Sequence, residues 1–350
     1  MTPRAAFAAA VLATLAFAPA GAQERLDAAG NPIGAGYEPP RLADGRPDLQ
    51  GFWTNVSLTA LERPRGFDEL VISDERAAEL AEQRARMAEA QLRPSDPTAP
   101  APTAGRDVGG YNSFWTDPGE TYATVNGTVR AHWIVEPADG RIPYTEEGRE
   151  ILETSIDAQR NTFTDPEIRP MAERCIVGFG STGGPPMLNV LYNNNYQIVQ
   201  SPDEVMILVE MNHDARIVRI DDAHHPESMR RWMGDSVGRW DGDTLVVETT
   251  NMHPDESLRL FFAQSLYISE NATITERFTR IADDEIFYEF EVDDPGVVSQ
   301  PWRAEMAFKA SDKPVYEYAC HEGNHALPGI LRGARLEEAA AVEASAAGEE

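Results

Sequence analysis

The sequence predicts a mainly β protein in which an antiparallel meander closes into a barrel, with peripheral helices and long loops. Short segments rich in β-branched and aromatic residues recur between residues 188 and 325. Turn signals such as Asp241-Gly242-Asp243 separate many of them, and residues 273–279 alternate as a strand with one solvated face does. Because no parallel strand–helix–strand unit is visible, strands joined by tight turns are the expected architecture.

The first 22 residues have the three parts of a secretory signal peptide. Arg4 supplies a positive charge, residues 5–18 form a short apolar segment, and Ala20-Gly21-Ala22 provides a small-residue cleavage site. A buried N-terminal helix is the alternative interpretation. We expect an exported protein, periplasmic or extracellular. We expect no membrane insertion, because no later segment approaches the roughly 18 apolar residues of a membrane-spanning helix.

The charge of the chain excludes some classes of partner. It has 58 acidic and 30 basic residues, and its formal net charge is -28. Nucleic acids and anionic lipid surfaces would be repelled by such a protein. We therefore expect a small-molecule ligand or substrate, and no feature of the sequence indicates an oligomeric state.

The mature chain begins with a segment rich in glycine and proline. Residues 23–48 are expected to be extended, and residues 49–335 to form a single β-rich domain. Its first strand is predicted at residues 49–54. A helix is predicted over residues 74–91, with Ser73 as the N-cap because its hydroxyl can accept a bond from a free N–H of the first turn.

Residues 55–185 are expected to be a region of helices and loops that covers the barrel. Asn126-Gly127 predicts a hairpin turn between strands at residues 122–125 and 128–135. A second helix is predicted over residues 145–160, with a threonine as its cap. Residues 92–110 and 175–186 hold the glycines and prolines of loops.

The meander is predicted for residues 188–325, and its last strand for residues 315–319. The acidic tail, residues 336–350, is expected to be a solvated helix or a frayed end. Cys175 and Cys320 are the two cysteines, and in an oxidising compartment we expect them to form a disulfide. Two buried free thiols, or a metal site that includes Cys320 and His321, are the alternatives.

Blocks at residues 139–143, 192–198, 210–216, 232–251 and 316–324 together resemble a large group of uncharacterised secreted bacterial proteins. The most specific blocks are Glu-Met-Asn-His-Asp-Ala-Arg, Gly-Arg-Trp-Asp-Gly-Asp-Thr-Leu-Val-Val-Glu-Thr and Cys-His-Glu-Gly-Asn. The resemblance covers most of the mature chain and implies no particular activity. Gly51-Phe52-Trp53 is similar to the Gly-x-Trp start of lipocalin-like barrels, which implies a lipocalin-like fold.

Polar residues are concentrated in the strand-like segment 210–220. His213 could be a general base, because histidine ordinarily titrates near neutrality and a carboxylate such as Asp214 can orient its ring. Arg216 could bind substrate and stabilise negative charge. In a strand, residue 213 points away from residues 214 and 216, so a bend must bring the three together. The alternative is a hairpin turn in which Asp214 caps backbone amides and Arg216 pairs at the surface.

The segment 320–324 is the second candidate. His321 and Glu322 could act as an acid–base pair at the end of a strand, and Asn324 could polarise a carbonyl. The alternative is a strand end held by the disulfide, with Glu322 and Asn324 as caps of a final helix. A shared active site requires His213 and His321 to converge on one cavity.

Several other residues suit a pocket of mixed polarity, although residues of these types are also common in a core. They are Tyr192, Asn193, Asn194, Tyr196, Trp240 and Trp302. Ser236 is not expected to be a nucleophile, because a strand rather than a helix follows Gly234-Asp235-Ser236-Val237-Gly238. His224, His225 and His253 are expected in surface loops.

The leading hypothesis is an exported enzyme without a redox cofactor. It would act on a small apolar or aromatic molecule by proton transfer, as isomerases, lyases and hydratases do. A non-catalytic periplasmic protein that binds a small ligand in the same pocket is the alternative. A second alternative is a metal-assisted hydrolase that uses His213, Asp214, His225 and His321, although no metal or other cofactor is expected.

Overall fold

The computed structural model describes residues 25–92, 98, 116–117, 119–261 and 264–348. The predicted signal peptide, residues 1–22, and most of the loop predicted at residues 92–110 lie outside this part of the chain. Within these described ranges, no helix combines the length and the apolar character needed to cross a membrane.

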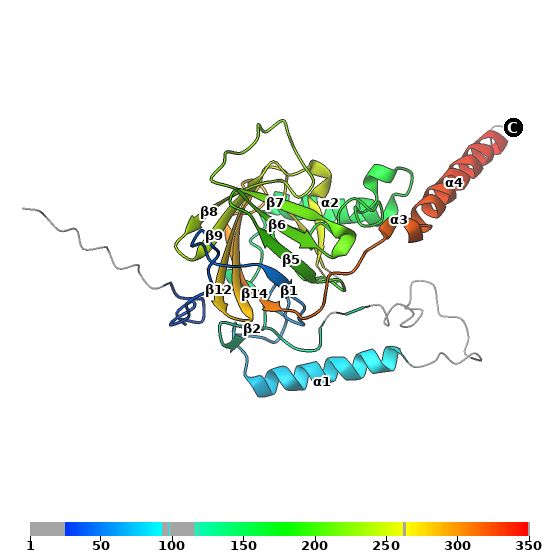
Figure 1. Cartoon of the computed structure of the whole chain (residues 1–350). Coiled ribbons are helices and arrows are strands. Elements are labelled where there is room, and N and C mark those ends of the chain that lie inside the picture. The colour runs from blue at the N-terminus through cyan, green and yellow to red at the C-terminus, as the bar shows by residue number, and fades with distance from the viewer. Residues whose placement is uncertain (1–24, 93–97, 99–115, 118, 262–263, 349–350) are drawn as a thin grey trace, which may run out of the picture.

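The predicted barrel is confirmed, and nine strands of the described chain close it (Figure 1). Each strand pairs with the next, and β14 pairs back with β1, where Trp53 lies opposite Ala310. In spatial order the strands are β1 (Gly51–Thr54), β5 (Asn195–Gln200), β6 (Glu204–Val209), β7 (Ala215–Ile220), β8 (Asp235–Asp241), β9 (Thr244–Thr250), β12 (Thr273–Ala282), β13 (Glu285–Asp293) and β14 (Trp302–Ala310).

One pairing differs from the predicted antiparallel meander. β7 and β8 run parallel, with Val218 opposite Ser236, and this correction makes the barrel mixed. A parallel neighbour requires the chain to return to the starting end of the barrel, and residues 221–234 make that return. The pairing begins at Val218, so residues 215–217 of β7 are not paired with β8.

Large side chains fill the barrel interior. The strand registers place Phe278, Tyr288 and Met306 on the same inward face, and each is at most 1% exposed. The rings of Tyr196 and Phe308 pack edge to face with their centroids 5.2 Å apart. Burial of each such side chain stabilises the fold by roughly 1.5–3 kcal/mol. The interior of this barrel is therefore a packed core.

The glycine- and proline-rich loop that follows Cys175 extends into one end of this core. Residues 180–190 are all buried, so their backbone polar groups need partners inside the protein. The Met187 N–H donates to the Tyr288 hydroxyl at 2.9 Å, and the Tyr196 hydroxyl donates to the Thr182 carbonyl at 3.1 Å. Two inward-facing tyrosines therefore hold the loop in place.

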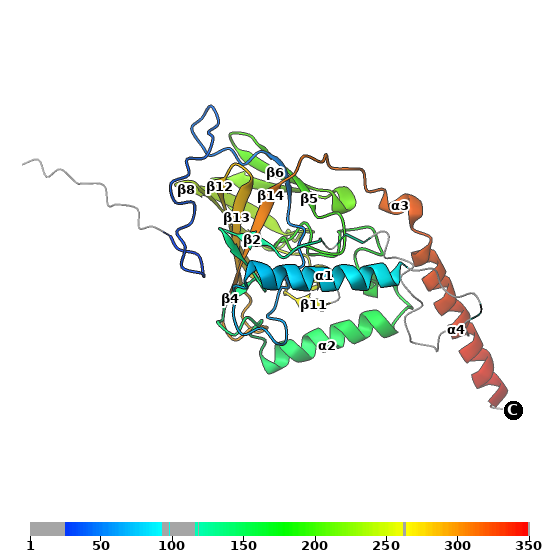
Figure 2. The same ribbon diagram turned by 90° about the horizontal axis from the view of Figure 1, so that it is seen from below.

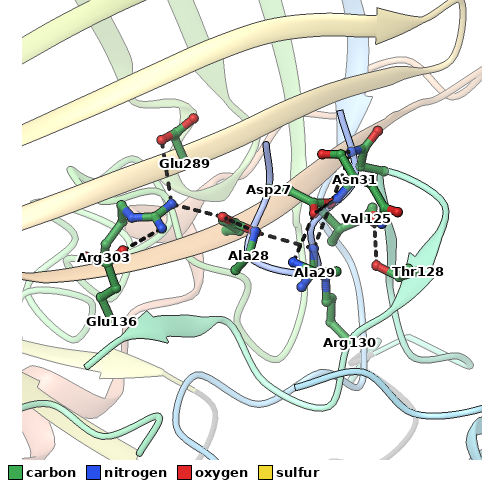
Figure 3. Close-up of polar contacts among 12 residues, drawn as sticks. Asp27, Ala28, Ala29, Asn31, Val125, Thr128, Arg130, Glu136, Glu289 and Arg303 are labelled. Carbon is green, nitrogen blue, oxygen red and sulfur yellow. Dashed lines mark hydrogen bonds and ion pairs between the residues drawn. The ribbon is translucent and has the colours of Figure 1, made fainter. Parts of the chain in front are cut away.

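The N-terminal segment, residues 25–48, lies on the outer face of the barrel and contains no strand beyond isolated bridges (Figure 1). Buried charges attach it, since Nη2 of Arg130 lies 3.1 Å from Asp27 and 3.3 Å from Glu305 of β14 (Figure 3). Glu305 also accepts the backbone N–H of Ala28 at 2.9 Å. Removing one member of such a buried network leaves the others without compensation.

Helices and shorter strands surround the barrel (Figure 2). The predicted N-caps are confirmed, because Ser73 accepts the Arg76 N–H at 3.2 Å and Thr145 accepts the Gly148 N–H at 2.9 Å. The helices are α1 (Asp74–Gln91), α2 (Glu146–Asn161), α3 (Cys320–Gly323), α4 (Ala326–Gly348), and the 3-10 helices η2 (Pro166–Ile168), η3 (Met211–His213) and η4 (Pro254–Glu256). The remaining strands are β2 (Thr124–Val125), β3 (Thr128–Val129), β4 (Ile134–Glu136), β10 (Leu258–Phe261) and β11 (Gln264–Tyr267).

Two predictions for the C-terminal region are wrong. Residues 315–319 form no strand, and β14 is the last strand of the described chain. The segment 320–324 therefore does not end a strand, since α3 begins at Cys320. The acidic tail is part of α4, which begins at Ala326 and projects from the barrel (Figure 1).

Candidate functional site

The polar segment around His213 is a hairpin turn, which was the alternative to a catalytic strand with a bend. Residues 210–214 connect β6 to β7, and the Val209 N–H donates to the Asp214 carbonyl at 2.8 Å. Asn212 and His213 have φ angles of 61° and 47°. Asparagine tolerates the left-handed conformation better than most residues, so the tight turn suits this sequence.

The side chains of this turn point to different surroundings. Glu210 is buried and accepts the Asn193 amide at 2.7 Å, and Asp214 accepts the backbone N–H of Gly178 at 3.2 Å. His213 is exposed, and its Nδ1 lies 3.1 Å from the backbone carbonyl of Tyr318. The turn therefore holds neighbouring segments more than it lines one cavity.

The chain just before the second predicted segment, 320–324, lies against this turn. The Tyr316 N–H donates to Glu210 at 3.1 Å, so the contacts between the two segments involve Tyr316 and Tyr318 rather than His321. His321 and Glu322 are exposed. Asn324 donates to the carbonyl of Glu173 at 2.6 Å, which attaches the start of α4 to the chain near Cys175.

The predicted disulfide between Cys175 and Cys320 is confirmed. Their Cα atoms lie 5.7 Å apart, and no cysteine of the chain is free. The bond is consistent with an oxidising compartment, because structural disulfides persist there. It places the loop that extends into the barrel beside the segment that follows the last strand.

The predicted pocket residues 192–194 stabilise a turn. Tyr192 is half-buried and packs edge to face on Phe179 with the ring centroids 5.7 Å apart, and burial raises its pKa to about 12. Asn194 is buried. Its Oδ1 accepts the Val190 N–H at 2.7 Å, and its Nδ2 donates to the Val190 carbonyl at 2.9 Å. The Asn193 side-chain amide donates its hydrogen bond to the Glu210 carboxylate.

Two of the predicted aromatic residues are fully inside the core. Tyr196 is 0% exposed, and Trp302 is 1% exposed with its ring edge to face on Phe290 at 5.4 Å. Trp240 is half-buried, and its buried indole N–H has no partner in the part of the chain that the structure describes. These residues pack against protein rather than line an open cavity.

Arg216 lies inside the barrel, so the alternative of a surface ion pair is wrong. Its guanidinium donates to Glu276 at 2.9 Å and to the Ser236 hydroxyl at 3.1 Å. The Tyr288 hydroxyl donates to the same Glu276 at 2.7 Å, and Ser236 and Thr249 bond to each other at 2.8 Å. Each of these buried polar groups therefore has a hydrogen-bond partner, which lowers the free-energy cost of burying charge.

Glu256 of η4 is a buried acid that sequence patterns did not indicate. Its side chain is 0% exposed, and one carboxylate oxygen accepts the Met233 N–H at 2.8 Å. The other oxygen, Oε1, lies 4.0 Å from Arg259 and has no hydrogen-bond partner among the described residues. Burial raises the pKa of Glu256 to about 7, and the opposing charge of Arg259 does not offset it.

Asp214 is a second carboxyl group in the same region. Burial raises its pKa to about 6, while the Gly178 N–H and the Asn212 side chain oppose the shift. The charge of Asp214 in turn raises the pKa of Glu256. The backbone of Gly183 passes close to both Asp214 and Met233, since a Cβ there would lie 2.8 Å from Met233 Sδ and 3.9 Å from Asp214 Cβ. Groups that titrate near neutrality in a buried cluster mark a candidate functional site.

A cavity of about 320 Å³ opens beside this cluster, along the part of β7 that β8 leaves unpaired. Trp232 and Met233 form part of its wall, together with Arg231 and His225. The Trp232 ring stacks on His253, with the ring centroids 4.0 Å apart. Met233 both lines the cavity and donates its N–H to Glu256, so this residue connects the cavity wall to the buried acid.

His224 and His225 both bond to Asp235, and Asp235 and His225 line this cavity. Burial opposes ionisation of Asp235, but hydrogen bonds from Arg219, His225 and His224 lower its pKa to about 2. His224 bonds to Asp235 at 3.1 Å and to Glu248 at 3.2 Å. Across the described chain, no three histidine, cysteine, aspartate or glutamate side chains are grouped closely enough to hold a metal ion.

No family model, no curated protein and no solved structure matches this chain.

Proposed function

We propose that this protein is an exported enzyme without a redox cofactor that transfers protons on a small apolar or aromatic molecule, with Glu256 as the general acid and base. The observation that carries the proposal is the buried oxygen Oε1 of Glu256, which has no hydrogen-bond partner among the described residues and belongs to a carboxyl group with a pKa of about 7. A group with this pKa is present in both protonation states at neutral pH and can take up and return a proton.

The cavity beside β7 would bind the substrate. Its volume of about 320 Å³ suits a small molecule, and Trp232 provides an aromatic wall. Arg231 lines the same cavity and would stabilise negative charge that develops as a proton is removed. Contact between substrate and Glu256 requires the Met233 side chain to move aside, which its flexible thioether chain permits.

The proposed location follows from two features of the chain. The first 22 residues have the composition of a signal peptide, and a disulfide joins Cys175 to Cys320. Export to the periplasm or the medium would account for both.

A non-catalytic binding protein is the second candidate. The complete burial of Glu256 favours it, because a rigid Met233 would keep the carboxyl group away from any ligand. In that case the same cavity would bind an aromatic molecule and Glu256 would have a structural role.

Solvent deuterium exchange separates the two candidates without knowledge of the natural substrate. The protein is incubated in D2O with phenylpyruvate and with 4-hydroxyphenylacetone, which are small aromatic molecules with acidic C–H groups, and proton NMR follows exchange at those carbons. We expect wild-type protein to accelerate exchange and Glu256→Gln to lower the rate by about 10²–10⁴, which is the usual contribution of a general base.

Glu291→Gln is the matched control, because Glu291 is an exposed carboxylate on β13 and its loss should leave the rate unchanged. Exchange that is equally fast in Glu256→Gln and wild type would contradict the assignment of Glu256. Saturable binding of either compound with no accelerated exchange would favour the binding protein.

A further inference from the structure

Helix α2 lies beside the β10–β11 hairpin outside the barrel (Figure 2). Residues of both elements line a second hollow. Its volume is about 630 Å³, roughly twice that of the cavity beside β7. None of its lining residues belongs to the Glu256 cluster or to the cavity beside β7. We call this hollow the α2 groove.

The floor and one wall of the α2 groove are apolar. Leu61, Phe261 and Leu266 contribute buried side chains, at no more than 2% exposure each. Leu152 and Ile156 of α2 are partly buried and form the helical wall. The floor side chains are already buried, so an apolar body placed here would cover mainly the exposed parts of Leu152 and Ile156 together with its own surface.

Arginines lie at both ends of this helical wall. Arg149, Leu152, Ile156 and Arg160 all line the groove, and their spacing of three, four and four residues places them on one face of α2. The α-helical rise puts the two arginines about 16 Å apart along the helix axis. Apolar surface therefore lies between two cationic groups.

Neither arginine has a carboxylate partner in the described part of the chain. The guanidinium of Arg149 lies over the Tyr144 ring, 5.9 Å from its centroid, and no ion pair of Arg149 or Arg160 is formed there. Two carboxylates also line the groove, but both already accept hydrogen bonds from neighbouring residues. Glu62 accepts the Ile142 N–H at 2.9 Å and lies 3.5 Å from Arg141, and Asp139 accepts the Arg141 N–H at 3.1 Å.

We propose that the α2 groove binds an organic acid with an elongated apolar body. Its anionic group would pair with Arg149 or Arg160, and its body would lie along Leu152 and Ile156 on the floor of the groove. A chain with a net charge of -28 repels anions at long range, so a stable anion site on it must provide local cations. Two arginines without carboxylate partners beside apolar surface meet that requirement, and this site does not depend on the proposed proton-transfer function.

Fluorescence titration with 11-(dansylamino)undecanoic acid tests this proposal on the full mature chain. We expect saturable binding that decanoate competes away and 1-decanol does not. The double variant Arg149→Gln/Arg160→Gln should weaken binding at least tenfold, because both cations are lost while the apolar surface stays. Both side chains are exposed, so the variant should keep the circular dichroism spectrum and the unfolding temperature of the wild type.

Arg76→Gln/Arg86→Gln removes the same charge from an exposed face of α1 and should bind the probe as the wild type does. The proposal would be overturned by equal affinity in the two double variants and the wild type. It would also be overturned if the alcohol competed as well as the carboxylate, since hydrophobic adsorption alone would then explain binding.

Discussion

At the scale of single residues, Glu256 makes a prediction about stability as well as about catalysis. Burial raises its pKa from 4.5 to about 7, so folding favours the protonated acid. The stability that comes from binding this proton is fully present below pH 4.5. It is lost as the pH rises from 4.5 through about 7, because the unfolded state releases the proton first. Replacement by glutamine, which cannot ionise, should raise the free energy of unfolding relative to wild type by about 3 kcal/mol at pH 8.

The measurement is urea unfolding of wild type and Glu256→Gln at pH 4 to 8, with the difference between them plotted against pH. The difference should grow between pH 4.5 and 7 and then level off. Glu291→Gln, which changes an exposed carboxylate, should show no such rise. A flat difference for Glu256→Gln would mean that this acid titrates in its ordinary range.

Sequence reasoning at this scale succeeded where the partner is close along the chain. Ser73 and Thr145 cap helices through N–H groups three residues away, and residue type and position indicate such a bond. Glu256 follows His253-Pro254-Asp255 and looks like a loop acid. Inside the protein it accepts the Met233 N–H and feels the charge of Arg216, and both residues come from other parts of the chain.

At the scale of elements, the docking of α2 depends on one glycine. Gly148 lies in the first turn of this helix, and a Cβ there would lie 2.1 Å from the backbone carbonyl oxygen of Val297. A backbone atom cannot move aside as a side chain can. We expect Gly148→Ala to lower the free energy of unfolding by about 1–3 kcal/mol, which urea unfolding would measure.

Gly333→Ala in α4 is the matched control. It makes the same substitution inside a helix, but no atom lies within 4 Å of the added Cβ. Its helix should become more stable by up to about 1 kcal/mol, seen as a small gain in helical circular dichroism. Equal effects of the two substitutions would show that helix propensity rather than contact with Val297 governs Gly148.

Elements with a clear alternation or a helix cap were predicted directly, whereas the polar segments were left between alternatives. The alternation in residues 273–279 corresponds to β12, where Ile274, Glu276 and Phe278 face the core. For residues 210–214, the sequence left a bent strand-like segment and a hairpin turn as alternatives, because apolar residues flank a polar run. The left-handed conformation of Asn212 makes them a turn, and no period in the sequence contains that information.

At the scale of the whole molecule, the disulfide joins segments 145 residues apart. Loss of the bond gives the unfolded chain more conformational entropy, which lowers the free energy of unfolding. This loss of stability increases with the length of the loop that the bond closes. We expect Cys175→Ser/Cys320→Ser to lower the free energy of unfolding by about 2–5 kcal/mol. Hydrogen exchange should also increase in residues 312–325, because the turn at residues 210–214 holds them through few other contacts.

Wild-type protein treated with reductant is the control and should match the double variant in both measurements. A thiol titration of unfolded, unreduced wild type should find no free sulfhydryl. Two titratable thiols per chain would contradict the bond.

The sequence by itself determined the class of fold, because strand alternation, turn residues and helix caps act over a few residues. It also indicated the disulfide, since an oxidising compartment leaves two cysteines one plausible partner each. The tertiary structure decided the parallel β7–β8 pairing, and with it the cavity beside β7. It also decided which polar residues are buried, because Glu256 gains its raised pKa only where distant segments exclude water from it.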